Sequence, residues 1–167
     1  MALREIVTEG YESLSKICKP VTSFDSRLEL LVKDMKDTLV KADGLGLAAP
    51  QIGVLKRLAI IIDGETDEMV ALINPEITAM SGVQNKTEGC LSVPGKQGLV
   101  KRPAYVRLEA LDRNGELKTY EGTELLARCF CHELDHLDGI LYVDKTKKFL
   151  YPDEEDGEYY LDEEDDI

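Results

Sequence analysis

The chain has 167 residues, 43% of them hydrophobic and 32% charged, and a formal net charge of −13 at pH 7. This length suits one domain with a hydrophobic core of its own. Such an acidic chain is poorly suited to neutralising phosphates, so direct nucleic-acid binding is not expected. No run of about 18 apolar residues predicts a membrane span. The start "MALREIVTEG" lacks the basic-then-apolar pattern of a secretory signal, and a cytoplasmic location is expected.

The negative charge is concentrated at the C-terminal end. Residues 153–167 contain ten Asp or Glu and no Lys or Arg, while the preceding residues carry 20 basic and 23 acidic side chains. Such a block is typically solvated and poorly ordered, with a specific docking role as the alternative. Three apolar or aromatic residues could anchor part of it: Tyr159, Tyr160 and Leu161. We therefore expect one folded domain over residues 1–150 and an acidic tail over residues 151–167.

The first predicted element is an amphipathic helix over residues 26–42. Its apolar residues recur at helical spacing: Leu28, Leu31, Val32, Met35 and Leu39. Asp25 or Ser26 can cap its start, and Gly44 is expected to end it. Two short β-branched runs follow, at residues 57–63 and 69–75, and both predict strands.

Residues 105–121 alternate polar and apolar side chains around Asn114-Gly115, which predicts a hairpin whose two central residues both have positive φ. Thr123 is expected to cap a second helix, "ELLARCFCHELDHL", which Gly139 ends. Strands therefore dominate the middle of the chain, with one helix before them and one after. This order predicts an α+β fold with antiparallel β-sheet rather than parallel βαβ units.

The second predicted helix carries the only two histidines of the chain, His132 and His136, with Glu133 between them. Residues four apart on a helix share a face, so the two imidazoles can bind one metal ion. A bound ion lowers the pKa of water towards about 7, and the Glu133 carboxylate can then remove a proton from it. The alternative is a surface helix that carries two histidines by chance.

This pattern leaves the third protein ligand open. Four cysteines are too few for a disulfide scaffold in a chain of this length, and near histidines they indicate a metal or reactive site. Cys129 lies on about the same helical face as His132, whereas Cys131 is turned about 100° away. Cys90, in the Gly-flanked segment "EGCLSVPG", is the candidate from elsewhere in the chain.

Three segments together resemble the signature motifs of peptide deformylases, in the family's order and spacing: "GLGLAAPQIG" (44–53), "EGCLS" (88–92) and "HELDH" (132–136). The first matches at Gly44, Gly46, Ala48, Ala49 and Gln51. The resemblance covers most of the chain, from the first predicted helix onwards. It implies a catalytic domain with antiparallel sheets around the central HExxH helix. The implied activity is hydrolytic removal of the formyl group from the N-terminal formyl-methionine of newly synthesised proteins.

The resemblance also implies the metal site. Cys90 would be the third ligand beside His132 and His136, and Cys129 would be a small buried apolar side chain. Similar enzymes use one ferrous ion per chain in the cell, which zinc, nickel or cobalt can replace. Two imidazoles and a thiolate do not by themselves select among these metals.

By the same resemblance, Glu133 acts as general acid and base. The Gln51 side-chain amide and the Leu91 backbone N–H donate to the oxyanion. Gly46 is expected to contact the peptide backbone of the substrate, and Gly44 serves either in that contact or in a turn.

Glu88 and Arg102 are weaker candidates. They are expected to pair and to hold the Cys90 loop. A surface ion pair of little energetic value is the alternative.

The expected partners are N-formylmethionyl nascent polypeptides. Some bacterial members of the family carry a basic C-terminal helix thought to engage the ribosome. Here Pro152 interrupts the chain and an acidic segment follows, so ribosome docking through this tail is not expected. Residues 92–103 resemble the Gram-positive-like branch of the family.

Three rival hypotheses remain at this point. An HExxH metallopeptidase would differ in its third ligand and would cut internal peptide bonds. A structural metal module would close all four positions, and it would leave Glu133 and the Gly/Gln segment without a purpose. A family member that has lost its activity is the third, although every residue expected to be catalytic is present.

Overall fold

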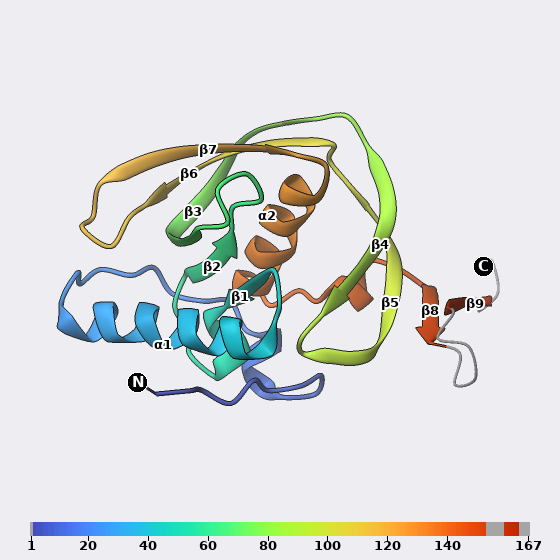
Figure 1. The fold of residues 1–167 in the computed structure, drawn as a ribbon, viewed down its shortest axis with the longest axis horizontal. Coiled ribbons are helices and arrows are strands. Elements are labelled where there is room, and N and C mark those ends of the chain that lie inside the picture. The colour runs from blue at the N-terminus through green and yellow to red at the C-terminus, as the bar shows by residue number, and fades with distance from the viewer. Residues whose placement is uncertain (1, 153–158, 164–167) are drawn as a thin grey trace.

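The computed structural model describes residues 2–152 and 159–163 (Figure 1). These residues form two α-helices, α1 (Ser26–Ala42) and α2 (Glu124–Leu137). One sheet holds five strands in the order β1-β2-β3-β6-β7: Gly46–Ala48, Leu58–Ile62, Met69–Ser81, Tyr105–Leu111 and Leu117–Thr123. The other holds four in the order β4-β5-β8-β9: Gln84–Cys90, Val93–Arg102, Lys148–Pro152 and Tyr159–Glu163. Short 3-10 helices are η1 (Glu12–Ser15), η2 (Ala49–Ile52) and η3 (Tyr142–Asp144).

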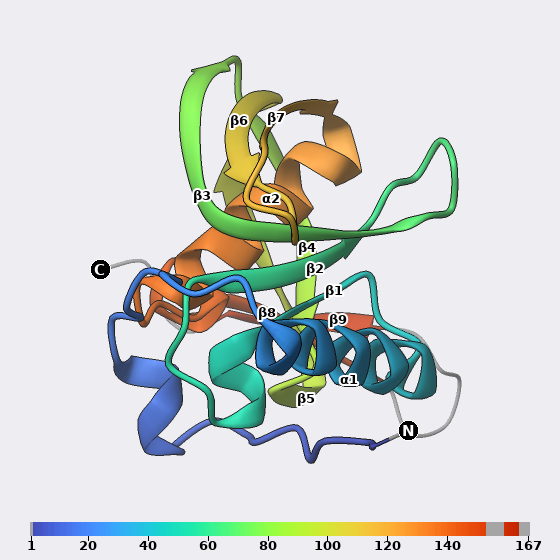
Figure 2. The ribbon, with the colours of Figure 1, turned by 90° about the vertical axis from the view of Figure 1, so that its left-hand side faces the viewer.

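The five-stranded sheet lies between the two helices (Figure 2). Successive side chains of a strand point to opposite faces. Ile60 of β2 accordingly packs in the cluster that contains the buried face of α1, and Ile61 packs in the cluster that contains α2. The β4–β5 hairpin lies along a further side of α2 (Figure 1), so this helix is enclosed by both sheets. The predicted α+β architecture with a central HExxH helix is confirmed.

Helix α1 has the predicted bounds, but a different residue from the one expected ends it. Asp25 caps the start, because its Oδ1 accepts the backbone N–H groups of Arg27 and Leu28, both at 3.1 Å. At the other end Asp43, not Gly44, takes the left-handed conformation, with φ 56°. The expectation that Gly44 ends the helix is therefore wrong, and Gly44 has another use described below.

Helix α2 also spans the predicted residues. Thr123 is its N-cap residue, as predicted, but the Thr123 side chain makes no capping hydrogen bond. Gly139 follows the C-terminal end of the helix with φ +75°, and a Cβ there would lie 2.7 Å from the carbonyl carbon of Ser15. Glycine is needed at this position both for its backbone angle and for space.

The predicted hairpin is present as β6 and β7, paired from Tyr105↔Thr123 to Leu111↔Leu117. Its loop is longer than the predicted two-residue turn. Gly115 has positive φ, but Asn114 does not. The Asp112 carboxylate instead accepts the backbone N–H groups of Asn114 and Glu116, at 2.8 and 3.0 Å. These hydrogen bonds stabilise a longer turn, in which Asn114 does not need the positive φ that was predicted for it.

The sequence pattern did not reveal strands β4 and β5, and β3 continues beyond the predicted residue 75 to Ser81. Strand β8 pairs with β5, and β9 pairs with β8 in the register Leu150↔Leu161 and Tyr151↔Tyr160. Strand β9 contains Tyr159, Tyr160 and Leu161, the three residues that were expected to be able to anchor part of the tail. Residues 153–158 and 164–167 lie outside the described part, and the division at residue 150 stays a prediction. Neither described helix has the length and apolar character needed to cross a membrane.

Candidate metal centre

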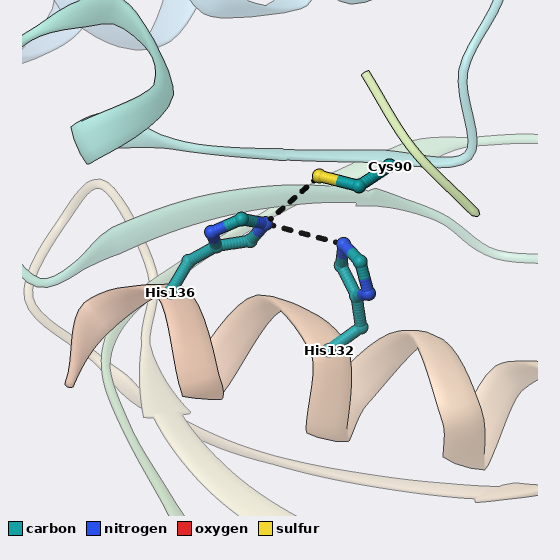
Figure 3. A group of neighbouring side chains, drawn as sticks. All are labelled: Cys90, His132 and His136. Atoms are coloured by element: carbon teal, nitrogen blue, oxygen red, sulfur yellow. Dashed lines mark hydrogen bonds between the residues drawn. The ribbon is translucent and has the colours of Figure 1, made fainter. Parts of the chain in front are cut away.

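Three possible metal ligands meet at the centre of the molecule. His132 and His136 project from successive turns of α2, and Cys90 reaches them from the end of β4 (Figure 3). The Nε2 atom of His136 lies 3.1 Å from Nε2 of His132 and 3.4 Å from Sγ of Cys90. All three atoms lie within 4.8 Å of one another. One ion at about 2.0–2.3 Å from each donor can bridge atoms spaced in this way.

Cys90 reaches this point because of the β4–β5 hairpin. The pairing of the two strands shifts register between Glu88 and Cys90, and Cys90 then pairs with Val93. The Ser92 backbone N–H donates to Cys90 Sγ at 3.4 Å. A turn tied in this way holds the sulfur over the helix.

Glu88 and Arg102 orient His132 from behind. Glu88 Oε1 lies 3.0 Å from Nδ1 of His132, and Arg102 donates to the Glu88 carboxylate from Nε and Nη2 at 3.0–3.2 Å. When His132 carries its proton on Nδ1, Nε2 offers a lone pair towards His136 and Cys90. Both side chains are buried, at 6% and 4% exposure, so the alternative of a surface ion pair is wrong.

The charge balance of this network keeps Glu88 ionised. Burial raises the pKa of the Glu88 carboxyl, but the hydrogen bond to His132 and the nearby positive charges outweigh it and lower the pKa. Arg102 also donates to Asp135 at 2.6 Å, and Lys145 pairs with Asp135 at 3.0 Å. The network therefore links the metal-site side chains to β5 and to the segment after α2.

The surroundings of the two imidazoles shift their pKa values in opposite directions. Burial lowers the pKa of His132, but hydrogen bonds with Cys90 and Glu88 outweigh it and raise the pKa to about 10. Burial and the neighbouring His132 lower the pKa of His136, so this imidazole is neutral and can act as a ligand. A thiol and two imidazoles, with a buried carboxylate hydrogen-bonded to one of them, are a donor set that fits a divalent ion.

Tyr142 is a contact of the site that the sequence pattern did not reveal. Its side chain is fully buried, and its ring stacks on that of His132 with centroids 6.3 Å apart and planes at 27°. The Tyr142 hydroxyl donates to the Lys96 carbonyl at 3.2 Å. Gly98 makes room for this ring, because a Cβ there would lie 2.9 Å from Tyr142 Cε2.

Glu133 lies beside the cluster and is only 3% exposed. Burial raises the pKa of its carboxyl to about 7. Among the described residues, none makes a hydrogen bond with Glu133 Oε2. A carboxyl group with this pKa can both take and return a proton near neutral pH.

Gln51 and Leu91 are also at the site. Gln51 is buried in η2, where its Oε1 accepts the Ala48 backbone N–H at 2.9 Å. Its Nε2 consequently faces the other way, donating to Ser92 Oγ at 3.1 Å and lying 3.6 Å from Cys90 Sγ. Leu91 follows Cys90, and its side chain packs on Gly44, where a Cβ would lie 2.8 Å from Leu91 Cδ1. Gly44 thus allows a close approach and does not cap α1.

A cavity of about 560 Å³ opens onto these groups. Gln51, Cys90, His132 and Glu133 line it, as do Leu45, Leu125, Arg128 and Cys129. Cys129 is half-buried rather than buried, and it is not part of the ligand cluster. Burial raises the pKa of the Cys129 thiol to about 12, so it stays protonated. The sequence pattern gave no reason to place Arg128 at this cavity.

Comparisons with known proteins agree with this geometry. The polypeptide deformylase family model matches residues 3–150. The peptide deformylase of Acetivibrio thermocellus is 53% identical over 154 residues, which cover 92% of this chain and 89% of that protein. Peptide deformylase 2 of Clostridium perfringens is 49% identical, with coverage of 89% and 96%.

Solved structures give the same result. The crystal structure of a peptide deformylase from Legionella pneumophila has a TM-score of 0.84 and 47% identity, and the match covers 87% of each chain. The Synechococcus elongatus peptide deformylase in complex with actinonin has a TM-score of 0.82 and 37% identity, covering 86% of this chain and 79% of that one. With the HExxH helix, the cysteine and the glutamine in one cavity, the chain belongs to the peptide deformylase family, metal-dependent hydrolases that remove the N-formyl group from nascent polypeptides.

Proposed function

We propose that Cys90, His132 and His136 hold one divalent metal ion and that Glu133 is the general acid and base of deformylation. The observation that supports this most directly is the convergence of the three ligand atoms within 4.8 Å, beside a cavity that Cys90, His132 and Glu133 line. When bound, the ion supplies Lewis-acid chemistry, which makes water a nucleophile near neutral pH.

Glu133 moves the proton. Its carboxylate accepts a proton from the attacking water and returns it to the amine nitrogen as the bond between that nitrogen and the formyl carbon breaks. The pKa of about 7 suits both steps. The products are formate and a peptide with a free N-terminal methionine.

Gln51 Nε2 and the Leu91 backbone N–H stabilise the negative charge that develops on the formyl oxygen. The hydrogen bond from Ala48 to Gln51 Oε1 orients the amide in advance, with Nε2 directed towards Cys90 and Ser92 beside the ligand cluster. Cys90 and Leu91 are consecutive, which brings the second donor to the ligand cluster.

Strand β1 receives the peptide backbone. It is the edge strand of the five-stranded sheet and pairs with β2 on one side. Gly46, the first residue of β1, and Leu45 just before it line the cavity. An extended peptide can therefore add to this edge with its first residue at the metal centre.

Glu88 and Arg102 act on the metal through His132, by the buried hydrogen bonds already described. The ion is ferrous iron in the cell, as in similar enzymes, and zinc, nickel or cobalt can replace it. The substrate places the enzyme in the cytoplasm close to translating ribosomes, without docking through the acidic tail.

The decisive test is anaerobic turnover of formyl-Met-Ala-Ser, with formate release and metal content measured for the wild type, Cys90→Ala and Cys129→Ala. We expect activity in the wild type and Cys129→Ala, and loss of both metal and activity in Cys90→Ala. If Cys129→Ala were the variant without metal, the ligand assignment would be wrong. A metal-loaded wild type that releases no formate would refute the proposed reaction.

A further inference from the structure

The N-terminal segment connects two parts of the site that lie far apart in the sequence. The Val7 backbone N–H donates to the Gln51 carbonyl at 2.8 Å. Two residues later, the Glu9 backbone N–H donates to the Ser92 carbonyl, also at 2.8 Å. The segment that makes both hydrogen bonds, residues 7–9, is called the strap below.

The strap joins the segments that carry the two oxyanion donors. One donor, the Gln51 side-chain amide, lies in η2, which directly follows β1 of the five-stranded sheet. The other, the Leu91 backbone N–H, follows β4 of the four-stranded sheet and directly precedes Ser92. The spacing of the donors therefore depends on how the two sheets are placed. Because the two strap N–H groups are two residues apart, they lie at most about 7 Å from each other and limit how far the carbonyls can separate.

The strap is held in place by its own neighbours. Just before it, the Arg4 guanidinium pairs with the buried Asp34 carboxylate of α1 at 3.0 Å. Ile6 packs against the cluster that contains the buried face of α1. Val7 packs against a different cluster, on which Cys90 also packs. Side chains at the start of the strap thus contact both the α1 side and the Cys90 side of the site.

A defined turn ends the strap. The Tyr11 backbone N–H donates to the Thr8 carbonyl at 3.0 Å, and Gly10 has φ +98°. Glu9 is not in the left-handed region. A positive φ at the third position alone is the pattern of a type II turn, with Glu9 at its second position. The turn fixes the direction of the Glu9 N–H towards Ser92.

We propose that the strap is a positioning element, which sets the spacing of Gln51 Nε2 and the Leu91 backbone N–H through its two hydrogen bonds. This inference rests on the proposed function of these two donors. A preorganised pair stabilises the developing charge only when both donors lie at hydrogen-bond distance from the oxygen. The donors act on charge that develops during the reaction, so a loosened strap lowers kcat and leaves KM and metal content near their wild-type values.

Glu9→Pro removes the donor to Ser92 and keeps the turn, because proline is favoured at the second position of a type II turn. We expect kcat for formyl-Met-Ala-Ser to fall by about 5- to 20-fold, less than for the loss of a whole oxyanion donor. KM, bound metal and the thermal unfolding midpoint should stay close to the wild-type values. Glu9→Ala is the matched control, because it keeps the backbone N–H and changes only an exposed side chain, so its kcat should match that of the wild type.

Gly10→Ala replaces Glu9→Pro if the proline variant does not fold. A Cβ at Gly10 has nothing within 4 Å, so this substitution acts only through the backbone angle of the turn. It should lower kcat and leave KM unchanged, as expected for Glu9→Pro.

A double-mutant cycle tests whether the strap acts through the donor pair. In Gln51→Met only one donor is left, and the strap has no spacing to set. Adding Glu9→Pro to this variant should therefore lower kcat much less than it does in the wild-type background. Equal fold-losses in the two backgrounds would overturn the inference. An unchanged kcat in Glu9→Pro, or an equal loss in Glu9→Ala, would overturn it as well.

Amide hydrogen exchange provides a readout that needs no turnover. Peptides that contain residues 49–52 and 90–92 should exchange faster in Glu9→Pro than in the wild type or Glu9→Ala, because segments that lose a connecting hydrogen bond open more often. Equal exchange in all three proteins would overturn the inference. Absence of formate release by the metal-loaded wild type would count against the proposed reaction instead, and the exchange comparison would still decide whether the strap holds the two segments.

Discussion

The side chain of Glu133 lies directly over Gly46: a Cβ on Gly46 would be 2.7 Å from Glu133 Oε1 and 3.0 Å from its Cδ. Glu133 comes from α2 and Gly46 from β1, so the contact joins the two segments whose separation sets the position of the carboxylate. The φ of Gly46 is not in the left-handed region. The need for glycine here is therefore steric.

Gly46→Ala should displace the Glu133 carboxylate and lower kcat by about 10- to 100-fold, because a displacement of about 1 Å at a reacting group has an effect of this size. Metal content should stay at the wild-type value, since the atoms nearest to a Cβ on Gly46 belong to Glu133 and not to the three ligands. Steady-state formate release measures the effect. Gly64→Ala is the control, because nothing lies within 4 Å of a Cβ there. A wild-type kcat in Gly46→Ala would show that the contact does not position Glu133.

Gln51→Met should lower kcat by about 10²- to 10³-fold, the usual effect of removing one oxyanion donor. The substitution preserves approximate volume but removes the Nε2 group that faces Cys90 and Ser92. Metal content should be unchanged, which separates this result from loss of the ion. Single-turnover formate release with metal-loaded protein is the measurement. An undiminished rate would exclude the Gln51 amide as a donor in the transition state.

Glu88→Gln should weaken metal affinity by about 10- to 100-fold, because the neutral amide is a poorer partner for His132 Nδ1 and no longer balances Arg102. Competition with a chelator of known affinity measures this directly. Glu116→Gln, at an exposed ion pair with Lys118, is the charge-matched control and should bind the metal as the wild type does. Equal affinities for both variants would show that Glu88 does not support the metal ligand.

Removing the metal with a chelator should abolish formate release and lower the thermal unfolding midpoint. A ligand that binds only the folded state at 100 times its Kd contributes about 2.7 kcal/mol. Adding back nickel or zinc in excess should restore the midpoint. The same addition to Cys90→Ala should restore much less, since one of its three ligands is missing. If Cys90→Ala gained as much stability as the wild type, the added ion would be binding elsewhere.

Local sequence patterns predicted the elements that depend mainly on residues close together in the sequence. The spacing of apolar residues gave α1 its bounds, and the HExxH spacing gave two ligands and a base, because residues four apart share a helix face. The residues that end a helix were harder to predict, because neighbouring residues can take the same role. At the end of α1, where Gly44 was expected to end the helix, Asp43 adopts the left-handed conformation. Residue 44 is a glycine because a Cβ there would collide with the Leu91 side chain.

The third ligand shows where local patterns stop. Helical geometry alone left Cys129 and Cys90 both open, and the resemblance of the motifs favoured Cys90. In the structure Cys90 reaches the histidines from the β4–β5 hairpin. We did not predict these two strands, because their sequence has no clear alternation of polar and apolar residues. The sequence also did not predict that Arg128 and Tyr142 lie at the site or that Glu88 is buried. These features depend on contacts between segments that are tens of residues apart in the sequence. Such contacts do not produce a periodic pattern of residues in either segment, so the sequence pattern does not predict them.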